Sequence, residues 1–281
     1  MNANIEVGFA ELTAAEYHAD LLALSHSQLE CFRRSPQEYY ERYVIKTLPR
    51  ETTSSMELGT AVHLAILQPI KFAEQVLLIP DDVLTSDGKK AGKKWQEYQA
   101  ANAGCSLLKR SEFNKINAIA LAVESCPTAK ALIDSCDRKE QAIYWSMEGV
   151  DCKALIDGLG DKVIIDLKTC LDSRPRAFAA QAARLGYHRQ ADWYQRGVYA
   201  VTGNTLPFIF IAVRNEPPYT VECIQLSTDF MAAAAVDNAE DLQRFIAHDA
   251  RDDWHSDTYD RLVTVDAPRW LKYEDEYSLE G

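Results

Sequence analysis

The sequence lacks the patterns that mark several classes of protein. Its seven cysteines include no C-x-x-C pair, so neither a zinc knuckle nor a disulfide framework is expected. No apolar run approaches the ~20 residues that span a membrane, and no signal-peptide pattern is found. No Pro-, Gly- or Ser-rich linker, repeat or low-complexity run divides the chain. These absences predict a cytoplasmic protein with no membrane partner, folded as a single domain over residues 1–281.

Positive charge is also scarce: the chain has 30 Lys and Arg but 42 Asp and Glu, which gives a net charge of -12. Nucleic-acid affinity comes largely from Lys and Arg on the phosphate backbone, so any such contact has to be local. Two groups of basic residues are candidates: Lys89, Lys90, Lys93 and Lys94, and then Arg174, Arg176, Arg184, Arg189 and Arg196. A lysine run is equally often a solvated helix face.

The most informative charges interrupt an apolar, β-branched segment at residues 161–169. Alternate side chains of a strand share a face, so Asp166 and Lys168 project to the same side. Asp157 ends the preceding predicted strand, and a meander places it beside Asp166. A salt bridge explains the Asp-Lys pair but not the third charge. Two adjacent carboxylates repel unless a divalent cation lies between them, which predicts a metal site.

Magnesium suits such a site, because it binds one or two carboxylates together with waters and phosphate oxygens. On a scissile phosphate it activates water and stabilises the leaving oxygen. Lys168 would hold the attacking water and offset charge at the transition state. The pattern therefore predicts metal-assisted phosphodiester hydrolysis.

A second pair follows on the helix predicted from residue 187 to 200. Gln190 and Tyr194 are four residues apart and share one helix face. Alone, this spacing more often describes a surface Gln and a half-buried core Tyr. Read with the acidic strands, the pair becomes a candidate for the same site.

Four further segments contribute to a resemblance. They are an S-x-S-x-L-x-x-F…P-x-x-Y string in residues 24–40, L-G-x-x-x-H at 58–63, a basic Gly-containing segment at 87–94, and A-P-R-W at 267–270. With the D…DxK…QxxxY core they resemble the PD-(D/E)XK nuclease superfamily, in particular exonuclease VIII (RecE) and its phage relatives. The iron-sulfur branch of that superfamily needs a cysteine trio near the C-terminus, where only Cys223 lies.

The resemblance implies a metal site and assigns its residues. The implied ligands are His63, Asp157, Asp166 and the carbonyl of Leu167, with Mg2+ as the ion. Because His63 offers a borderline nitrogen ligand, Mn2+ would substitute. A polar residue on the flank of an amphipathic helix is the other interpretation of His63. Gln190 and Tyr194 would contact the substrate phosphate or the water network.

The implied fold is α/β, a restriction-endonuclease-like core with a central mixed β-sheet flanked by helices and a helical N-terminal extension. Residues 1–135 would be mainly helical and include the His63 helix, and residues 136–281 would form the catalytic core. Helices are predicted at about 27–46, 54–68, 90–103, 111–134, 176–202 and 228–248. Strands are predicted at about 75–80, 140–147, 150–157, 162–168, 206–214 and 219–226.

The implied function is a Mg2+-dependent 5′ to 3′ exonuclease on linear double-stranded DNA, leaving 3′ single-stranded tails for recombination. The alternatives are an endonuclease or single-strand nuclease of the same fold, or a catalytically silent DNA-end-binding module. The implied partners are DNA ends, further copies of the chain in a ring, and a RecT-like single-strand annealing protein.

Contacts to DNA are predicted at Ser27, Arg33, Lys93, Lys153 and Arg189. Ser27 also opens an S-x-x-E string that reads as a helix-capping box, as does Ser35, so capping alone would explain both serines.

Overall fold

The computed structural model describes residues 6–49, 54–255 and 262–267. Its helices are α1 (Ala14–Ala19), α2 (His26–Arg34), α3 (Pro36–Tyr39), the π-helix η1 (Tyr40–Val44), α4 (Ser54–Leu67), α5 (Pro69–Gln75), α6 (Lys93–Ala101), α7 (Arg110–Glu124), α8 (Pro127–Asp134), α9 (Pro175–Leu185), α10 (Tyr187–Thr202) and α11 (Thr228–Arg251). Its strands are β1 (Gly8–Ala10), β2 (Leu24–Ser25), β3 (Val76–Leu78), β4 (Ser106–Leu108), β5 (Arg138–Met147), β6 (Val150–Leu159), β7 (Ile164–Cys170), β8 (Phe208–Arg214) and β9 (Val221–Gln225).

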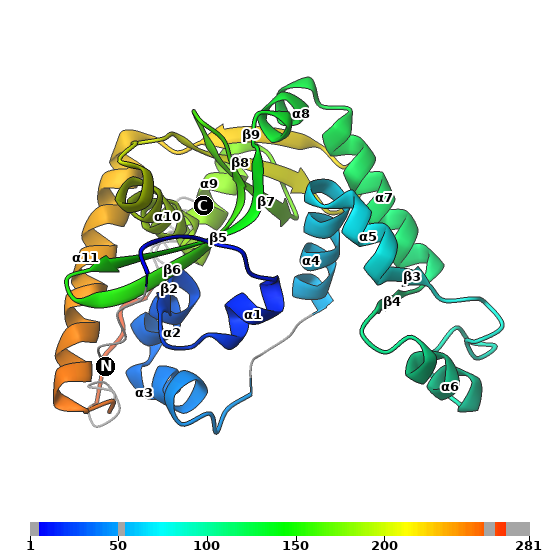
Figure 1. Ribbon diagram of the computed structural model, residues 1–281, viewed down its shortest axis with the longest axis horizontal. Helices are drawn as coiled ribbons and strands as arrows, with labels where there is room; N and C mark the ends of the chain where they lie inside the picture. The colour runs from blue at the N-terminus through cyan, green and yellow to red at the C-terminus, as the bar shows by residue number, and fades with distance from the viewer. Residues whose placement is uncertain (1–5, 50–53, 256–261, 268–281) are drawn as a thin grey trace, which may run out of the picture.

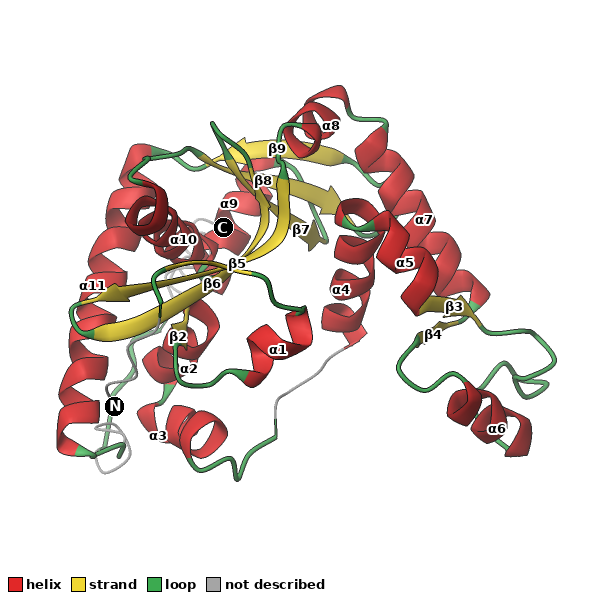
Figure 2. Cartoon of the chain, in the orientation of Figure 1, coloured by secondary structure: helices red, strands yellow, loops and turns green. Residues whose placement is uncertain are grey.

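The main sheet has the order β1-β5-β6-β7-β8-β9, with β2 also paired to β6 (Figures 1 and 2). Strands β5, β6 and β7 form the predicted antiparallel meander, whereas β7 and β8 are parallel over their whole length. A parallel pair needs a crossover, and helices α9 and α10 provide it. The sheet is therefore mixed, as predicted.

Helices cover both faces of the sheet, and each face has its own apolar core. One core joins the strands to α2, α10 and α11, around Phe32, Trp145 and Trp193. The other joins them to α4, α7 and α8, around Val62, Ile119 and Ile165. Burial on both faces explains the near-continuous apolar character of β7 and β8. The central strands β6 and β7, which carry Asp157 and Asp166, lie between these two helical layers.

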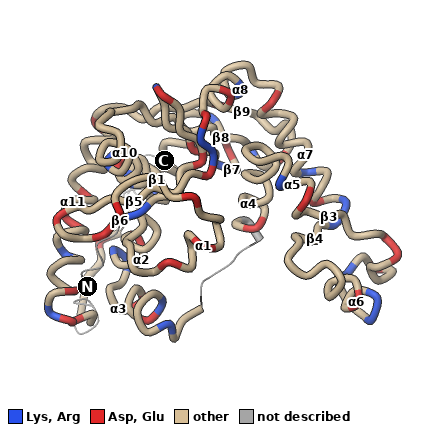
Figure 3. The backbone as a smooth tube through the Cα atoms, viewed as in Figure 1, with Lys and Arg blue, Asp and Glu red and all other residues tan. Residues whose placement is uncertain are grey.

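Part of the N-terminal segment joins the main sheet, since β1 pairs with β5 and β2 with β6. The segment around α6 departs from the layers as an arm, with β3 and β4 at its base (Figure 1). Figure 3 shows both acidic and basic positions on this arm, and Lys89 and Lys94 lie close to Asp87 and Asp82. The arm therefore carries no net cationic surface.

Several predicted helices are interrupted. The helix predicted at 27–46 stops at Ser35, which caps the next helix through a hydrogen bond from Glu38 N, with Pro36 in its first turn. The helix predicted at 111–134 breaks before Pro127, and the one at 176–202 breaks at Gly186, whose φ of +73° is left-handed.

The capping box predicted to begin at Ser27 was wrong. Ser25 is the N-cap of α2 and exchanges hydrogen bonds with Gln28. The sequence patterns did not predict β1, β2, β4, α1 or α5, which are short. Among the described residues no single helix has the length and apolar composition to cross a membrane. Helices α7 and α8 reach that length and composition only as a pair, and the pair is bent by 88°.

Candidate active site

The site begins where strands β6 and β7 separate. Their ladder pairs Leu159 with Ile164 and Gly158 with Ile165, and the next residues in this register are Asp157 and Asp166. Both residues are buried: 8% of the surface of Asp157 and 1% of the surface of Asp166 is exposed. The structure therefore brings the two acids together at the opening of the meander, as the sequence predicts.

Asp157 fills the gap that this separation leaves. Its Oδ2 accepts a hydrogen bond of 2.7 Å from the backbone N–H of Leu167. The same oxygen lies 3.3 Å from Nδ1 of His63. Burial alone would raise the pKa of Asp157, but the charges of His63 and Lys168 and the Leu167 hydrogen bond lower it below its ordinary value. Asp157 is thus held as a carboxylate.

His63 reaches the site from α4, which packs on the opposite side of β7 from α10. Its Nε2 lies 2.7 Å from the Leu167 carbonyl oxygen, which can only accept, so Nε2 carries the proton. Nδ1 then faces the carboxylates. Burial favours the neutral ring, but Asp157 outweighs it and raises the pKa of His63 to about 10.

Glu140 is the site residue that the sequence analysis missed. Its Oε1 lies 3.9 Å from His63 Nδ1, and Glu140, His63 and Asp157 have ligand atoms within 4.8 Å of one another. The register of β5 and β6 places Glu140 opposite Asp157, and its φ of +52° is left-handed. Such a conformation costs about 1–3 kcal/mol in a non-glycine residue and marks functional sites. The sequence offers one signal for it, a Glu within the predicted strand beside that of Asp157.

Asp166 makes different contacts from Asp157. Lys168 Nζ lies 2.7 Å from its Oδ2, and Gln190 Nε2 donates to its Oδ1 at 2.8 Å. The lysine is close but off the hydrogen-bond direction, so Oδ2 is buried without a directed hydrogen bond. Burial raises the pKa of Asp166 to about 6, against the opposing charge of Lys168.

The remaining predicted residues enclose this carboxylate. Burial would lower the pKa of Lys168, but Asp166 and Asp157 raise it, so the lysine stays charged. Its Nζ also lies 5.0 Å from the centre of the Tyr187 ring, a cation–π contact. Burial and the nearby carboxylates raise the pKa of Tyr194 well above its ordinary value, so its hydroxyl is neutral. The structure thus assembles Asp157, Asp166, Lys168, Gln190 and Tyr194 in one place.

With this geometry in place, comparison with known proteins identifies the family. The profile described as a PDDEXK-like domain of unknown function (DUF3799) matches residues 25–256. The chain belongs to this PDDEXK-like family. The predicted resemblance to PD-(D/E)XK nucleases is therefore confirmed.

Solved structures agree with the PDDEXK-like fold. A candidate exonuclease from Eubacterium rectale superposes with a TM-score of 0.64 at 14% identity, over 95% of this chain and 99% of that one. This likeness confirms the predicted α/β fold with its central mixed sheet. An alkaline exonuclease (LHK-Exo) from Laribacter hongkongensis covers 68% of this chain and 89% of its own at 17% identity, but its TM-score of 0.29 is too low to argue from. No curated protein matches.

The donor set of this PDDEXK-like site fits a hard divalent cation. The carboxylates of Glu140 and Asp157 and the imidazole of His63 lie together, a set that suits Mg2+ or Mn2+, and the Leu167 carbonyl lies beside His63. Asp166 Oδ2 is ion-paired with Lys168 but is buried without a directed hydrogen bond, so it keeps a lone pair that a cation could take up. His63 and Asp157, both predicted ligands, meet Glu140 directly, while the assignment of Asp166 and Leu167 stays a prediction.

Two predicted DNA contacts were wrong. Lys153 is 2% exposed and donates from Nζ to the carbonyls of Tyr17 and Asp20, because its strand lies under α1. Arg189 is 8% exposed and is paired with acidic residues of two other helices. Neither cation faces solvent, so neither is available to a phosphate backbone.

The other predicted DNA contacts remain predictions. Arg33 is half-buried and hydrogen-bonds Asp241 at 2.6 Å. Ser27 and Lys93 are exposed, and Lys93 lies 3.8 Å from Glu97. The A-P-R-W string lies outside the described residues beyond position 267.

Proposed function

We propose that the protein is a metal-dependent exonuclease acting on linear double-stranded DNA. The observation that carries this proposal is the juxtaposition of Asp157, Asp166 and Lys168 at the mouth of the β6–β7 meander, with His63 and Glu140 beside them. Membership of the PDDEXK-like family supports it. So does the fold shared with the candidate exonuclease from Eubacterium rectale.

The chain's own residues suggest how the reaction runs. His63, Glu140, Asp157 and Asp166 would hold the cation, whose chemistry is to activate water and neutralise charge on the phosphate. Lys168, charged and next to Asp166, would orient the attacking water by donating hydrogen bonds to its oxygen. The same ammonium would offset the negative charge that develops on the phosphoryl oxygens.

Helix α10 supports this arrangement. Gln190 fixes Oδ1 of Asp166 through its amide, which turns Oδ2 toward Lys168 and the proposed cation. The neutral hydroxyl of Tyr194 would donate to a phosphate oxygen or a water at the same wall. Each group acts by position, since the barrier to phosphodiester cleavage depends on alignment and electrostatics.

The direction and biological use of the cleavage rest on the resemblance to exonuclease VIII. We propose 5′ to 3′ digestion that leaves 3′ single-stranded tails for recombination, where a RecT-like annealing protein would take them up. We also propose that copies of the chain close into a ring around the DNA. A ring would keep the end from diffusing away between cuts and make digestion processive.

The test is a gel time course in Mg2+ on linear, nicked and circular duplexes labelled at either end. The expected result is loss of the 5′ label as mononucleotide, a surviving 3′-terminated strand, and an intact closed circle. Cleavage of the closed circle would identify an endonuclease instead. Binding of ends without any cleavage in Mg2+ or Mn2+ would leave a silent DNA-end-binding module.

A further inference from the structure

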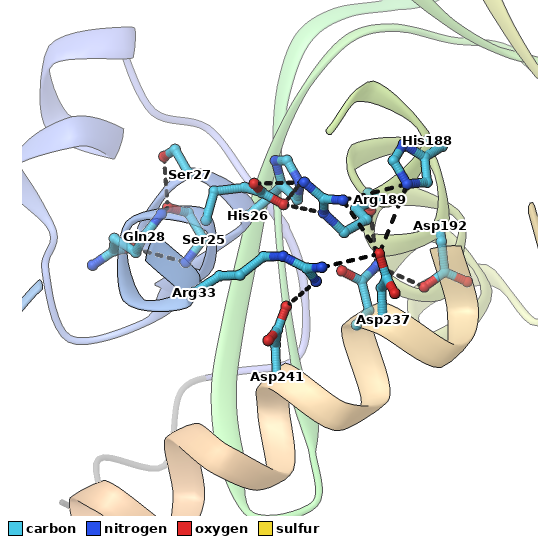
Figure 4. Close-up of polar contacts among 12 residues, drawn as sticks. Ser25, His26, Ser27, Gln28, Arg33, His188, Arg189, Asp192, Asp237 and Asp241 are labelled. Carbon is cyan, nitrogen blue, oxygen red and sulfur yellow. Dashed lines mark hydrogen bonds and ion pairs between the residues drawn. The ribbon is translucent and has the colours of Figure 1, made fainter. Parts of the chain in front are cut away.

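A cluster of charged side chains joins three helices next to the candidate active site (Figure 4). At its centre is Arg189, in the first turn of α10. Its guanidinium forms a bidentate salt bridge with Glu30 of α2, in which Nη2 lies 2.8 Å from Oε2 and Nε donates to Oε1. Its Nη1 lies 3.2 Å from Asp237 Oδ2 of α11. One side chain therefore ties α10 to both neighbouring helices.

The backbone at Arg189 is fixed as well. Asn238 of α11, itself buried, donates its amide to the Arg189 carbonyl at 2.8 Å. Gly186 begins this turn at φ +73°, and a Cβ there would lie 2.7 Å from Arg189 Nη2 and 3.0 Å from the Glu30 carboxyl. The glycine both allows the turn between α9 and α10 and leaves room for the pair. The position of this turn is therefore determined by more than apolar packing.

The pair is well suited to hold a position. A planar guanidinium meeting a carboxylate through two hydrogen bonds fixes orientation, which a lysine ammonium does not. Burial favours protonation of Glu30, but the hydrogen bonds from Arg189 and the His26 ring, 3.4 Å from Oε1, outweigh it and lower the pKa of Glu30 to about 2. The carboxylate is thus charged whenever the protein is folded near neutral pH.

The residue that follows Arg189 is Gln190, whose amide donates to Asp166 Oδ1 at 2.8 Å. We propose that the Arg189–Glu30 pair is a positioning device that sets Gln190 against Asp166. Arg189 and Glu30 touch neither the substrate nor the cation, and they act through Gln190 alone. Only the kinetic test of this inference rests on the proposed nuclease function.

The same cluster supplies a matched control. Arg244 of α11 pairs with Asp241 at 3.1 Å and lies 5.4 Å from the centre of the Phe32 ring of α2, so it joins α2 to α11 without holding the first turn of α10. Lysine at Arg244 removes a guanidinium contact, as lysine at Arg189 does. Only the second substitution releases the turn that carries Gln190.

The test is a double-mutant cycle on the full chain with Arg189→Lys, Gln190→Ala and both changes, with Arg244→Lys as control. We measure kcat and KM on linear duplex in Mg2+ and the melting temperature of each variant. Arg189→Lys should lower kcat about tenfold or more with KM within twofold, because small misplacements at a reacting centre are costly. In the Gln190→Ala background the same change should alter kcat less than twofold. Arg244→Lys should leave kcat within twofold.

Equal losses of kcat from Arg189→Lys in both backgrounds would overturn the proposal, as would unchanged kcat in Arg189→Lys. If Arg189→Lys does not fold, Glu30→Gln replaces it in the cycle with the same expectations, because it weakens the pair without changing its shape.

A second readout needs no activity. The side-chain amide of Gln190, identified in a 1H–15N spectrum by its loss in Gln190→Ala, should shift in Arg189→Lys and not in Arg244→Lys. If it shifts while the wild type cuts no DNA, the proposed function fails and the positioning pair stands. If it does not shift, the positioning pair is wrong whatever the activity.

Discussion

Asp157 caps the backbone N–H of Leu167 across the opening between β6 and β7, at 2.7 Å. The same carboxylate faces His63, whose other ring nitrogen donates to the carbonyl of Leu167. The backbone N–H of Leu167 therefore bonds to Asp157, and its carbonyl oxygen bonds to His63. This closed arrangement gives the site a defined shape before any cation binds.

The first prediction concerns catalysis. Lys168→Ala and Asp166→Ala should each lower DNA cleavage in Mg2+ by about a thousandfold or more, because each removes a charge needed at the transition state. The exposed Lys162→Ala should retain wild-type rates. Near wild-type turnover in either correctly folded site variant, measured on end-labelled duplex, would place the reaction elsewhere.

The second prediction concerns Asp157. Clustered carboxylates alone suggest that Asp157→Asn relieves repulsion, but in the structure Asp157 is the main counter-charge of His63. In EDTA, Asp157→Asn should therefore melt lower than wild type, by the equivalent of about 1–3 kcal/mol. It should also lose most of the rise in melting temperature that Mg2+ or Mn2+ gives by binding the native state. An unchanged metal-induced rise would move the cation site away from Asp157.

The third prediction concerns Glu140. Its carboxylate is positioned with His63 and Asp157, so Glu140→Gln should weaken Mn2+ binding about tenfold or more, measured as a shift in the concentration that raises the melting temperature. Glu222→Gln, on the exposed surface of β9, serves as the control. If Glu140→Gln and the control respond alike to Mn2+, Glu140 is not a ligand.

The fourth prediction concerns acid stability. Because the folded pKa of Glu30, about 2, lies below its ordinary value of 4.5, the pair contributes stability above pH 4.5 and loses it as the pH falls toward 2. Wild type should therefore melt above Glu30→Gln near neutral pH, with the gap closing between pH 4.5 and 2. Glu240→Gln, an exposed residue of α11, should differ little from wild type throughout. A gap that stays constant across this range would contradict the shifted pKa.

The fifth prediction concerns assembly. If the chain closes into a ring, light scattering should give three or four times the 31.6 kDa mass of one chain. Digestion of a long duplex should then continue after competitor DNA is added. A monomer at micromolar concentration that releases its substrate after each cut would exclude the ring and leave the chemistry of the site untouched.

Local patterns in the sequence were enough to predict the strands that carry the acidic site residues, and their order. Alternation along 161–169 put Asp166 and Lys168 on one face, a short turn put Asp157 opposite, and helical spacing joined Gln190 to Tyr194. These relationships depend on local geometry and on neighbours in the chain, which periodicity reports directly. The boundaries that failed, at Ser35, Pro127 and Gly186, lie inside continuous helical patterns where one backbone conformation ends the helix.

Which charges face the site depends on contacts between segments that are far apart in the sequence. His63 meets Leu167 across 104 residues of sequence, and Arg189 meets Glu30 across 159. Glu140 enters through strand register and a left-handed φ, neither of which its residue type encodes. Lys153 and Arg189 read as exposed cations in the sequence, yet both are buried against partners from distant segments. A buried charge needs its partner, and the partner is known only once the chain has folded.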